Sequence, residues 1–177
     1  MTVQPGIRRI RRPADDDQVQ RLDATFETAQ AFRVVREAAA LRLERIDLER
    51  AQTRQFPVVL DADPWTDGWV ATSGDAVVAF IATSFADWNR RLTIWHFYVD
   101  PSWRRQGLGR RLMLQALAEG AERGALHAWL ETNNFNVPGV EAYGRLGFEI
   151  TGFDLTLYAA TSRDDEFALF LSRRISV

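Results

Sequence analysis

The segment from Val99 to Leu117, VDPSWRRQGLGRRLMLQAL, places Gly107 and Gly109 between an apolar run and a helix-forming run. The preceding residues, RLTIWHFY, are typical of a β-strand. The residues after Gly109 put four apolar side chains on one helical face: Leu112, Met113, Ala116 and Leu117. Glycine weakens a helix by about 1 kcal/mol relative to alanine, so its presence here needs a reason. The segment predicts a strand, a tight turn and a helix whose start must lie close to something else.

A helix that begins directly after a glycine turn offers a binding site for an anion. Its first N–H groups have no partner within the helix, and the helix dipole is positive there. Glycine also removes the Cβ that would keep a phosphate away from the backbone. Four arginines add donors suited to phosphate oxygens: Arg104, Arg105, Arg110 and Arg111. The segment therefore predicts a pyrophosphate site.

Two common pyrophosphate motifs do not fit this turn. A dinucleotide-binding fold needs a G-x-G-x-x-G run after its first strand and an acidic residue about 20 positions later. The turn lacks that form. A P-loop needs Gly-Lys followed by Ser or Thr, and the chain contains no lysine.

Composition limits the class of protein. A chain of 177 residues, 46% hydrophobic and 26% charged, is expected to fold as one domain over residues 1–177. Its net charge of −2 argues against a nucleic-acid partner. The chain has no cysteine, which excludes disulfides, thiolate metal sites and covalent thiol catalysis. Its two histidines, His96 and His127, are too few for a histidine-built zinc site, so we expect no metal.

Nothing in the sequence indicates a membrane protein. The N-terminus, MTVQPGIRRIRRP, has no apolar targeting segment, and no apolar run approaches the ~20 residues of a membrane span. We expect a cytoplasmic protein with no membrane partner.

The pattern of strands and helices predicts an α/β fold. IRRIRRP indicates a first strand that ends at Pro13, and a short helix is expected from Asp15 to Thr25. The stretch Phe32–Leu48, within the ambiguous residues 31–60, contains alanines that favour a helix, whereas Leu41–Glu44 alternates as a strand does. We favour a hairpin there. Leu60–Gly68 is rich in turn formers and is expected to be a loop.

The second half has clearer patterns. They predict a hairpin around Gly74–Asp75, a strand at Arg91–Val99, a helix at Gly107–Arg123, a strand at Leu126–Glu131, a helix at Val137–Leu146, and strands at Phe148–Tyr158 and Phe167–Arg173. Elements in this order predict a mixed, mostly antiparallel central sheet with helices packed on it.

Two motifs resemble those of the GNAT superfamily of N-acetyltransferases. Arg104-x-x-Gly107-x-Gly109, preceded by Val99-Asp100-Pro101, is similar to its acetyl-CoA signature. The later segment LETNNFNVPGVEAYGRLGF, Leu130–Phe148, resembles its second landmark, an Asn, a Pro, a Tyr and then Gly-Phe. The resemblance implies the GNAT fold, with helices on both faces of the sheet, a splay between two central strands, and acetyl-CoA as cosubstrate.

Within the superfamily, the segment Asn136–Tyr158 is most similar to the streptothricin acetyltransferases. It contains Gly152-x-Asp154 and a later Tyr after the Gly-Phe pair. Two positions differ: Trp95 stands where those enzymes often carry Glu, and Gly139 replaces their usual Ala. The resemblance implies a small-molecule amine as acceptor. There are two alternatives. The acceptor could be another amine, such as a polyamine or a peptide N-terminus, or the chain could be a non-catalytic acyl-CoA-binding module.

The resemblance also assigns roles. Backbone N–H groups from Gln106 to Arg110 would hold the pyrophosphate, with Arg104 and Arg105 nearby, and the strand edge at Phe97 and Val99 would pair with the pantetheine arm. The cofactor-binding set is Phe97, Val99, Arg104, Arg105, Gln106, Gly107, Leu108, Gly109, Arg110 and Asn136. Asn136 would bind pantetheine or cap the following helix.

Two residues are expected to act in catalysis. Tyr143 is the expected general acid, because a phenol beside the departing CoA sulfur can protonate the thiolate. Glu131 is the expected base, and Asp154 is the second candidate. Without cysteine, the amine is expected to attack the thioester directly in a ternary complex. By the alternation of a strand, His96 points away from Phe97 and Val99 and is expected to be a core residue. A homodimer is left open.

Overall fold

The computed structural model describes residues 4–160 and 165–175. The chain forms two compact units. The first unit consists of Met1–Ala24, Gln55–Leu130 and Arg173–Val177, and the second of Thr25–Arg54 and Glu131–Ser172. Each unit is assembled from segments far apart in the sequence.

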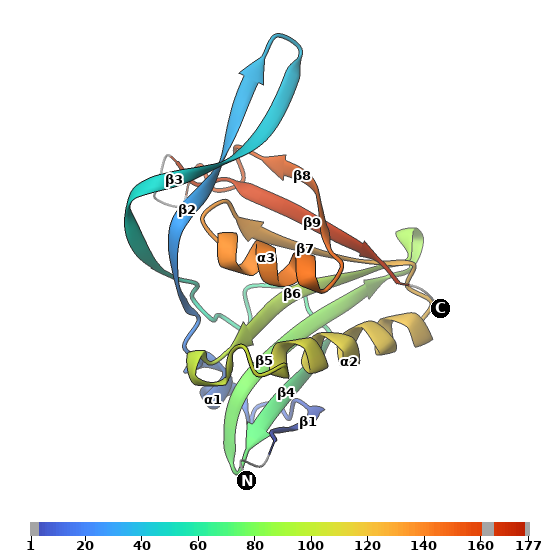
Figure 1. Ribbon diagram of the computed structural model, residues 1–177. Helices are drawn as coiled ribbons and strands as arrows, with labels where there is room; N and C mark the ends of the chain where they lie inside the picture. The colour runs from blue at the N-terminus through green and yellow to red at the C-terminus, as the bar shows by residue number, and fades with distance from the viewer. Residues whose placement is uncertain (1–3, 161–164, 176–177) are drawn as a thin grey trace. The chain divides into compact units, whose positions relative to one another are not determined.

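The first unit is built on a mixed sheet with strand order β1-β4-β5-β6-β7 (Figure 1). Its strands are β1 Gly6–Arg9, β4 Asp67–Ser73, β5 Ala76–Ala86, β6 Arg91–Val99 and the part of β7 (His127–Asn133) that precedes Glu131. The pairs β1–β4, β4–β5 and β5–β6 are antiparallel, whereas β6 and β7 are parallel. The parallel pairing runs from Arg91–His127 to Ile94–Leu130. The expected splay would lie beyond these pairs and stays a prediction.

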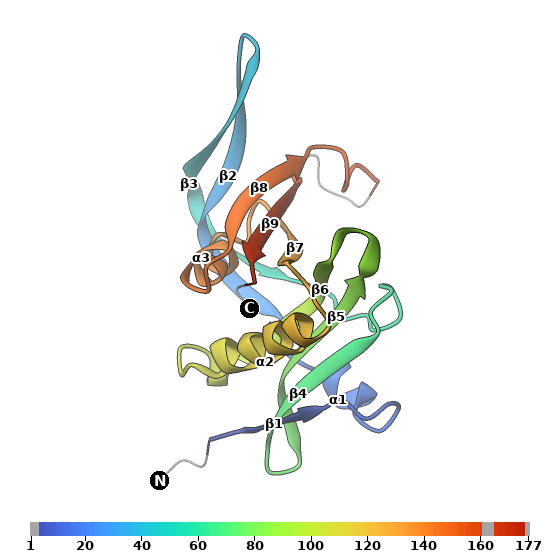
Figure 2. The same cartoon turned by 90° about the vertical axis from the view of Figure 1, so that its right-hand side faces the viewer.

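Helices cover both faces of this sheet (Figure 2). Tyr98 of β6 packs against an apolar cluster that includes Val19 of α1 (Asp16–Gln20). Its neighbours Phe97 and Val99 point to the opposite face, where α2 (Leu108–Glu122) lies against them at Gly109. The predicted helical face is confirmed, because Leu112, Met113, Ala116 and Leu117 are all buried.

The second unit contains a long hairpin, a short helix and two further strands (Figure 1). The hairpin joins β2 Thr25–Glu37 to β3 Ala40–Gln55, and α3 Val137–Arg145 packs on β2. β8 Glu149–Asp154 pairs antiparallel with β9 Ala168–Arg174, and β9 lies between β7 and β8 in the strand order.

The expected fold class and the hairpin are confirmed, and three predicted elements are too long. The first strand ends at Arg9 rather than at Pro13. The helix expected over Asp15–Thr25 ends at Gln20, because Thr25 already belongs to β2. The strand expected over Phe148–Tyr158 ends at Asp154, whose carboxylate accepts hydrogen bonds from the N–H and hydroxyl of Thr156, each at 2.7 Å. That side-chain turn replaces the strand ladder.

Two further properties concern the described residues alone. None of their helices is long and apolar enough to cross a membrane. Among residues 4–160 and 165–175, no three His, Asp or Glu side chains are grouped so as to hold a metal ion.

Candidate active site

The turn between β6 and α2 is fixed by its own side chains. Asp100 Oδ1 accepts a hydrogen bond from the N–H of Ser102 at 2.9 Å and another from the Ser102 hydroxyl. Gln106 Nε2 donates to the carbonyl of Ser102 at 2.8 Å. Because these bonds form within the loop itself, the start of α2 is held in place before any ligand binds.

The two glycines of this turn have different physical reasons. Gly107 is the N-cap of α2 and has φ of +79°, a conformation that favours glycine. Gly109 lies inside the first turn, where a Cβ would be 3.3 Å from Phe97 Cζ and 3.4 Å from Val99 Cγ2. Gly109 therefore lets the helix start pack closely on β6, while its backbone remains uncovered by a side chain.

Two of the four arginines expected to bind phosphate donate hydrogen bonds to the protein itself. Arg104 Nε donates to the carbonyl of Val99 at 2.7 Å and its Nη2 donates to that of Asp23 at 3.1 Å. Burial lowers the pKa of this guanidinium. Arg111 donates to Gln4 Oε1 and to the carbonyl of Pro5, both at 3.1 Å. Arg104 and Arg111 thus hold the loop and the N-terminal segment, and their expected contact with phosphate stays a prediction.

Arg105 and Arg110 are exposed on either side of the glycines. Their charges add to the positive end of α2, where an anion is favoured. Leu108 is 2% exposed, so its side chain belongs to the core, and its expected contact with the cofactor would come from its backbone.

Strand β6 has a bulge at Trp95. Ala82 of β5 pairs with His96 and Thr83 pairs with Ile94, so Trp95 is the extra residue. Its indole N–H donates to Ser84 Oγ at 2.8 Å. Trp95 is therefore held by both the bulge and a hydrogen bond.

His96 is a core residue, as its position in the strand predicts. It is 4% exposed and stacks on Phe80 with ring centroids 5.9 Å apart. Its Nδ1 lies 3.3 Å from the Tyr98 hydroxyl and its Nε2 lies 3.4 Å from Asp63 Oδ2. Burial lowers the pKa of His96, although the Asp63 carboxylate opposes that shift.

In the second unit, Asn136 caps the helix that carries Tyr143. Its Oδ1 accepts from the N–H of Gly139 at 3.0 Å, and its Nδ2 donates to Thr132 Oγ1 at 2.9 Å. The preceding Asn133 turns the chain, since its Oδ1 accepts from the N–H groups of Phe135 and Asn136. The capping role expected for Asn136 is confirmed; the pantetheine contact stays a prediction.

The geometry of this cap leaves no room for a side chain at Gly139. A Cβ at Gly139 would lie 2.2 Å from Asn136 Nδ2 and 2.5 Å from its Oδ1. These distances are far shorter than van der Waals contact, so the cap in this form requires glycine.

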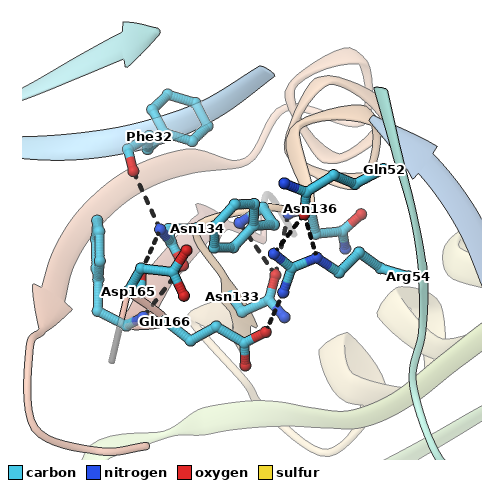
Figure 3. Close-up of polar contacts among 10 residues, drawn as sticks. Phe32, Gln52, Arg54, Asn133, Asn134, Asn136, Asp165 and Glu166 are labelled. Carbon is cyan, nitrogen blue, oxygen red and sulfur yellow. Dashed lines mark hydrogen bonds and ion pairs between the residues drawn. The ribbon is translucent and has the colours of Figure 1, made fainter. Parts of the chain in front are cut away.

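Asn134 ties three backbone segments together (Figure 3). Its Nδ2 donates to the carbonyls of Phe32 at 3.1 Å and Asp165 at 3.0 Å, and its Oδ1 accepts from the N–H of Phe167 at 3.1 Å. Asn134 is 2% exposed, and losing these partners would leave buried polar groups unsatisfied.

Arg54, at the end of β3, forms a second buried anchor (Figure 3). Its Nη1 donates to Glu166 Oε1, and its Nε and Nη2 donate to Gln52 Oε1 at 3.1 and 2.7 Å. The guanidinium carbon lies 3.7 Å from the centroid of the Phe135 ring. Arg54 therefore connects β3 with the segment that enters β9.

The predicted catalytic residues of the second unit occupy different settings. The Tyr143 ring on α3 packs edge-to-face on Phe148, with centroids 6.0 Å apart. Glu131 is an exposed residue of β7, and its Oε1 accepts a hydrogen bond from the Tyr158 hydroxyl. Asp154, expected as a second base, uses its carboxylate in the turn with Thr156, and these bonds lower its pKa. Asp154 therefore ends β8, and its role as a second base stays a prediction.

A pocket of about 280 Å³ lies in the second unit beside the hairpin and α3. Three carboxylates line it: Glu27, Asp47 and Glu141. Gln30 Nε2 donates to Asp47, and Arg45 pairs with Glu141, each at 2.8 Å.

Comparison with known proteins identifies the family. Residues 30–148 match the model of the acetyltransferase (GNAT) family. The chain belongs to the GNAT family. The acetyl-CoA-dependent N-acetyltransferase class expected from its motifs is confirmed.

This GNAT chain is similar to several characterised acetyltransferases. It is 36% identical to the streptothricin acetyltransferase of Streptomyces lavendulae over 93% of this chain and 92% of that one. It is 34% identical over 80 residues to the [ribosomal protein bS18]-alanine N-acetyltransferase of Escherichia coli K12, covering 45% of this chain and 54% of the relative.

Solved structures agree with the GNAT fold. The crystal structure of nourseothricin acetyltransferase matches with a TM-score of 0.89 and 35% identity, over 98% of this chain and all of that chain. A Bacillus anthracis str. Ames acetyltransferase, crystallised with acetyl coenzyme A, matches with a TM-score of 0.81 and 23% identity over the same coverage, which supports the fold.

The sequence analysis does not identify three residues that make long-range contacts within the second unit: Arg54, Asn134 and Tyr158. Arg54 and Glu166 are 112 positions apart, so no local pattern connects them. The NNFN run at 133–136 was a visible signal for Asn134, since adjacent asparagines are typical of turns and caps. Tyr158 belongs to the family motif in the sequence, which gives no sign of its contact with Glu131.

Proposed function

We propose that this enzyme transfers the acetyl group of acetyl-CoA to a primary amine of a streptothricin-type antibiotic. The observation that supports the acceptor is the similarity to the Streptomyces lavendulae streptothricin acetyltransferase, which extends over 93% of this chain. The similarity to nourseothricin acetyltransferase, at 35% identity, supports the same acceptor class. The product would be the N-acetylated antibiotic.

The turn at Gln106–Arg110 is the proposed site for the acetyl-CoA pyrophosphate. Gly107 and Gly109 leave the backbone there uncovered, and the exposed Arg105 and Arg110 supply charge. The first N–H groups of α2 would donate to phosphate oxygens, and the helix dipole would favour their charge.

We assign the chemistry to Tyr143 and Glu131. The neutral amine nitrogen attacks the thioester carbonyl carbon, a C–N bond forms, and the C–S bond breaks. Glu131 would take the proton that the acceptor ammonium loses before the attack, and Tyr143 would give a proton to the departing thiolate. The second proton, which the nitrogen loses as the amide forms, would return Tyr143 to its neutral form. The reaction needs no acetyl-enzyme intermediate, so transfer is sequential.

The acceptor carries positive charge, and carboxylates would attract it. Glu27, one of the acidic residues suited to this purpose, lines the pocket beside the hairpin together with Asp47 and Glu141. A cationic acceptor amine pairs favourably with such groups. Glu131 adds a further carboxylate in the same unit.

Mass spectrometry of the reaction products tests the proposal. The enzyme is incubated with acetyl-CoA and streptothricin, beside an established streptothricin acetyltransferase as positive control. We expect a single added acetyl group on the antibiotic. No adduct, with the positive control active, would overturn the acceptor while leaving the family assignment in place.

A peptide N-terminus is the second candidate acceptor, favoured by the 34% identity to the [ribosomal protein bS18]-alanine N-acetyltransferase over 80 residues. An alanine-initiated peptide and spermidine, assayed in parallel, would separate this activity from the first. We expect both to react at least about tenfold more slowly than streptothricin, a difference equivalent to about 1.4 kcal/mol in transition-state binding.

The setting of the enzyme is part of the proposal. A cytoplasmic location fits a reaction that consumes acetyl-CoA, and cell fractionation tests it. The sequence leaves the choice between a monomer and a homodimer open, and light scattering on the purified protein decides it.

A further inference from the structure

The phenol of Tyr158 contacts the carboxylate that we assign as the catalytic base. Tyr158 follows β8, and its hydroxyl donates a hydrogen bond to Glu131 Oε1 on β7. Burial and the neighbouring carboxylates of Glu131 and Glu166 raise the pKa of Tyr158 well above its ordinary value. Tyr158 therefore keeps its proton, and remains a donor, throughout the physiological pH range.

The chain before Tyr158 is held in a defined turn. The Asp154 carboxylate accepts from the N–H and hydroxyl of Thr156, and the N–H of Ala159 donates to the carbonyl of Thr156 at 3.0 Å. Tyr158 lies between Thr156 and Ala159 in this turn. Its hydroxyl is thus presented to Glu131 by a turn that the loop forms from its own groups.

The two carboxylates near Tyr158, Glu131 and Glu166, have different hydrogen-bond partners. Glu166 forms an ion pair with Arg54, whose guanidinium is buried against Phe135 (Figure 3). That pair neutralises Glu166 in place. Tyr158 is an uncharged donor, so it can orient Glu131 without cancelling the negative charge that a base needs.

We propose that Tyr158 is a positioning residue for Glu131. Its O–H holds the carboxylate in one orientation and favours the ionised form, and it keeps its own proton throughout turnover. The proton that leaves the acceptor ammonium goes to Glu131. This inference rests on the proposed function, specifically on Glu131 acting as the base.

The test is Tyr158→Phe, which keeps the ring and removes the donor. We expect kcat to fall by roughly tenfold, because an oriented base loses one of its positioning hydrogen bonds. Removing a donor to the ionised form raises the carboxylate pKa, so the acidic limb of kcat/KM for the acceptor should move up by about one pH unit. The acetyl-CoA dissociation constant should stay the same.

Tyr98→Phe is the matched control, since it removes another phenol hydroxyl, the one beside His96 in the first unit. We expect its acidic limb to stay at the wild-type pH. In a Glu131→Gln background, Tyr158→Phe should change kcat by less than about twofold, because the two residues act through one step.

The outcomes separate the inference from the proposed function. If the wild type acetylates streptothricin and the acidic limb of Tyr158→Phe does not move, the inference is overturned and the function stands. If Glu131→Gln keeps wild-type turnover, the base assignment fails and the inference fails with it. If neither streptothricin, the alanine-initiated peptide nor spermidine reacts, the pKa of Glu131 is measured by NMR of the carboxyl-labelled protein. A rise in Tyr158→Phe supports the inference, and an unchanged value overturns it.

Discussion

Asn136 and Gly139 form a matched pair at the start of α3. The Asn136 amide forms two hydrogen bonds: its Oδ1 accepts from the N–H of Gly139, and its Nδ2 donates to Thr132 Oγ1. Gly139 leaves the space that this arrangement needs, since a Cβ there would overlap Asn136. The helix that carries Tyr143 therefore begins at a fixed point, which sets where the phenol can lie.

Gly139→Ala should destabilise the protein. The new methyl group forces Asn136 out of its capping position, and losing an N-cap costs about 1 kcal/mol. Gly144→Ala is the matched control on the same helix, because nothing lies within 4 Å of its Cβ position. That change should be neutral or stabilising, since alanine is the better helix former. Urea unfolding of the three proteins decides the matter, and equal stabilities for both variants would contradict the explanation.

Tyr143→Phe should lower turnover and leave the fold intact. The variant keeps the ring contact with Phe148 and removes the proton donor. Loss of a general acid typically reduces kcat by about 10² to 10⁴, while the acetyl-CoA dissociation constant should be unchanged. Steady-state kinetics with the identified acceptor, together with calorimetry, provide both numbers. Unchanged turnover would make Tyr143 a packing residue.

The sequence predicted elements best where the signal was local. β6 matches its predicted range, and α2 begins and ends within one residue of expectation, because glycine turns and apolar periodicity mark both. The hairpin of β2 and β3 was ambiguous, since alanines and alternating charged residues give mixed patterns. β8 was predicted too long because the apolar run continues past Asp154, while the Asp154 side chain ends the strand.

At the start of α2, Gly109→Glu should abolish tight acetyl-CoA binding. The carboxylate would add a negative charge to the first turn of α2, beside the proposed pyrophosphate site, and would disfavour the bound phosphates. Gly109→Gln is the control, because it adds nearly the same volume against Phe97 and Val99 without charge. We expect the dissociation constant of the Glu variant to exceed that of the Gln variant by about tenfold or more in calorimetry. Equal affinities would place the pyrophosphate elsewhere.

At the scale of the whole chain, the contacts that join distant segments could not be predicted. The Asn134 amide binds Phe32 and Asp165 from segments 102 and 31 positions away. Arg104 is predicted to bind the ligand, and the sequence gives no sign that its Nε and Nη2 also donate to the carbonyls of Val99 and Asp23. A basic side chain beside a glycine turn has the same sequence pattern in either role. Its partners are set by tertiary packing, which a single sequence does not encode locally.

Stability of the whole protein should fall as the solution is acidified from pH 7 toward pH 5. His96 is buried and its pKa is lowered, so the folded state resists a proton that the unfolded state accepts below its ordinary pKa of 6.5. The contribution of His96 is therefore complete above pH 6.5 and is lost as the pH falls toward its folded pKa. His96→Phe, which can stack on Phe80 in the same way, should show a smaller decrease of Tm between pH 7 and pH 5 in calorimetry. The chain has one other histidine, so His127→Gln is the matched control and should keep the wild-type decrease. A wild-type decrease in His96→Phe would show that other groups cause the acid sensitivity.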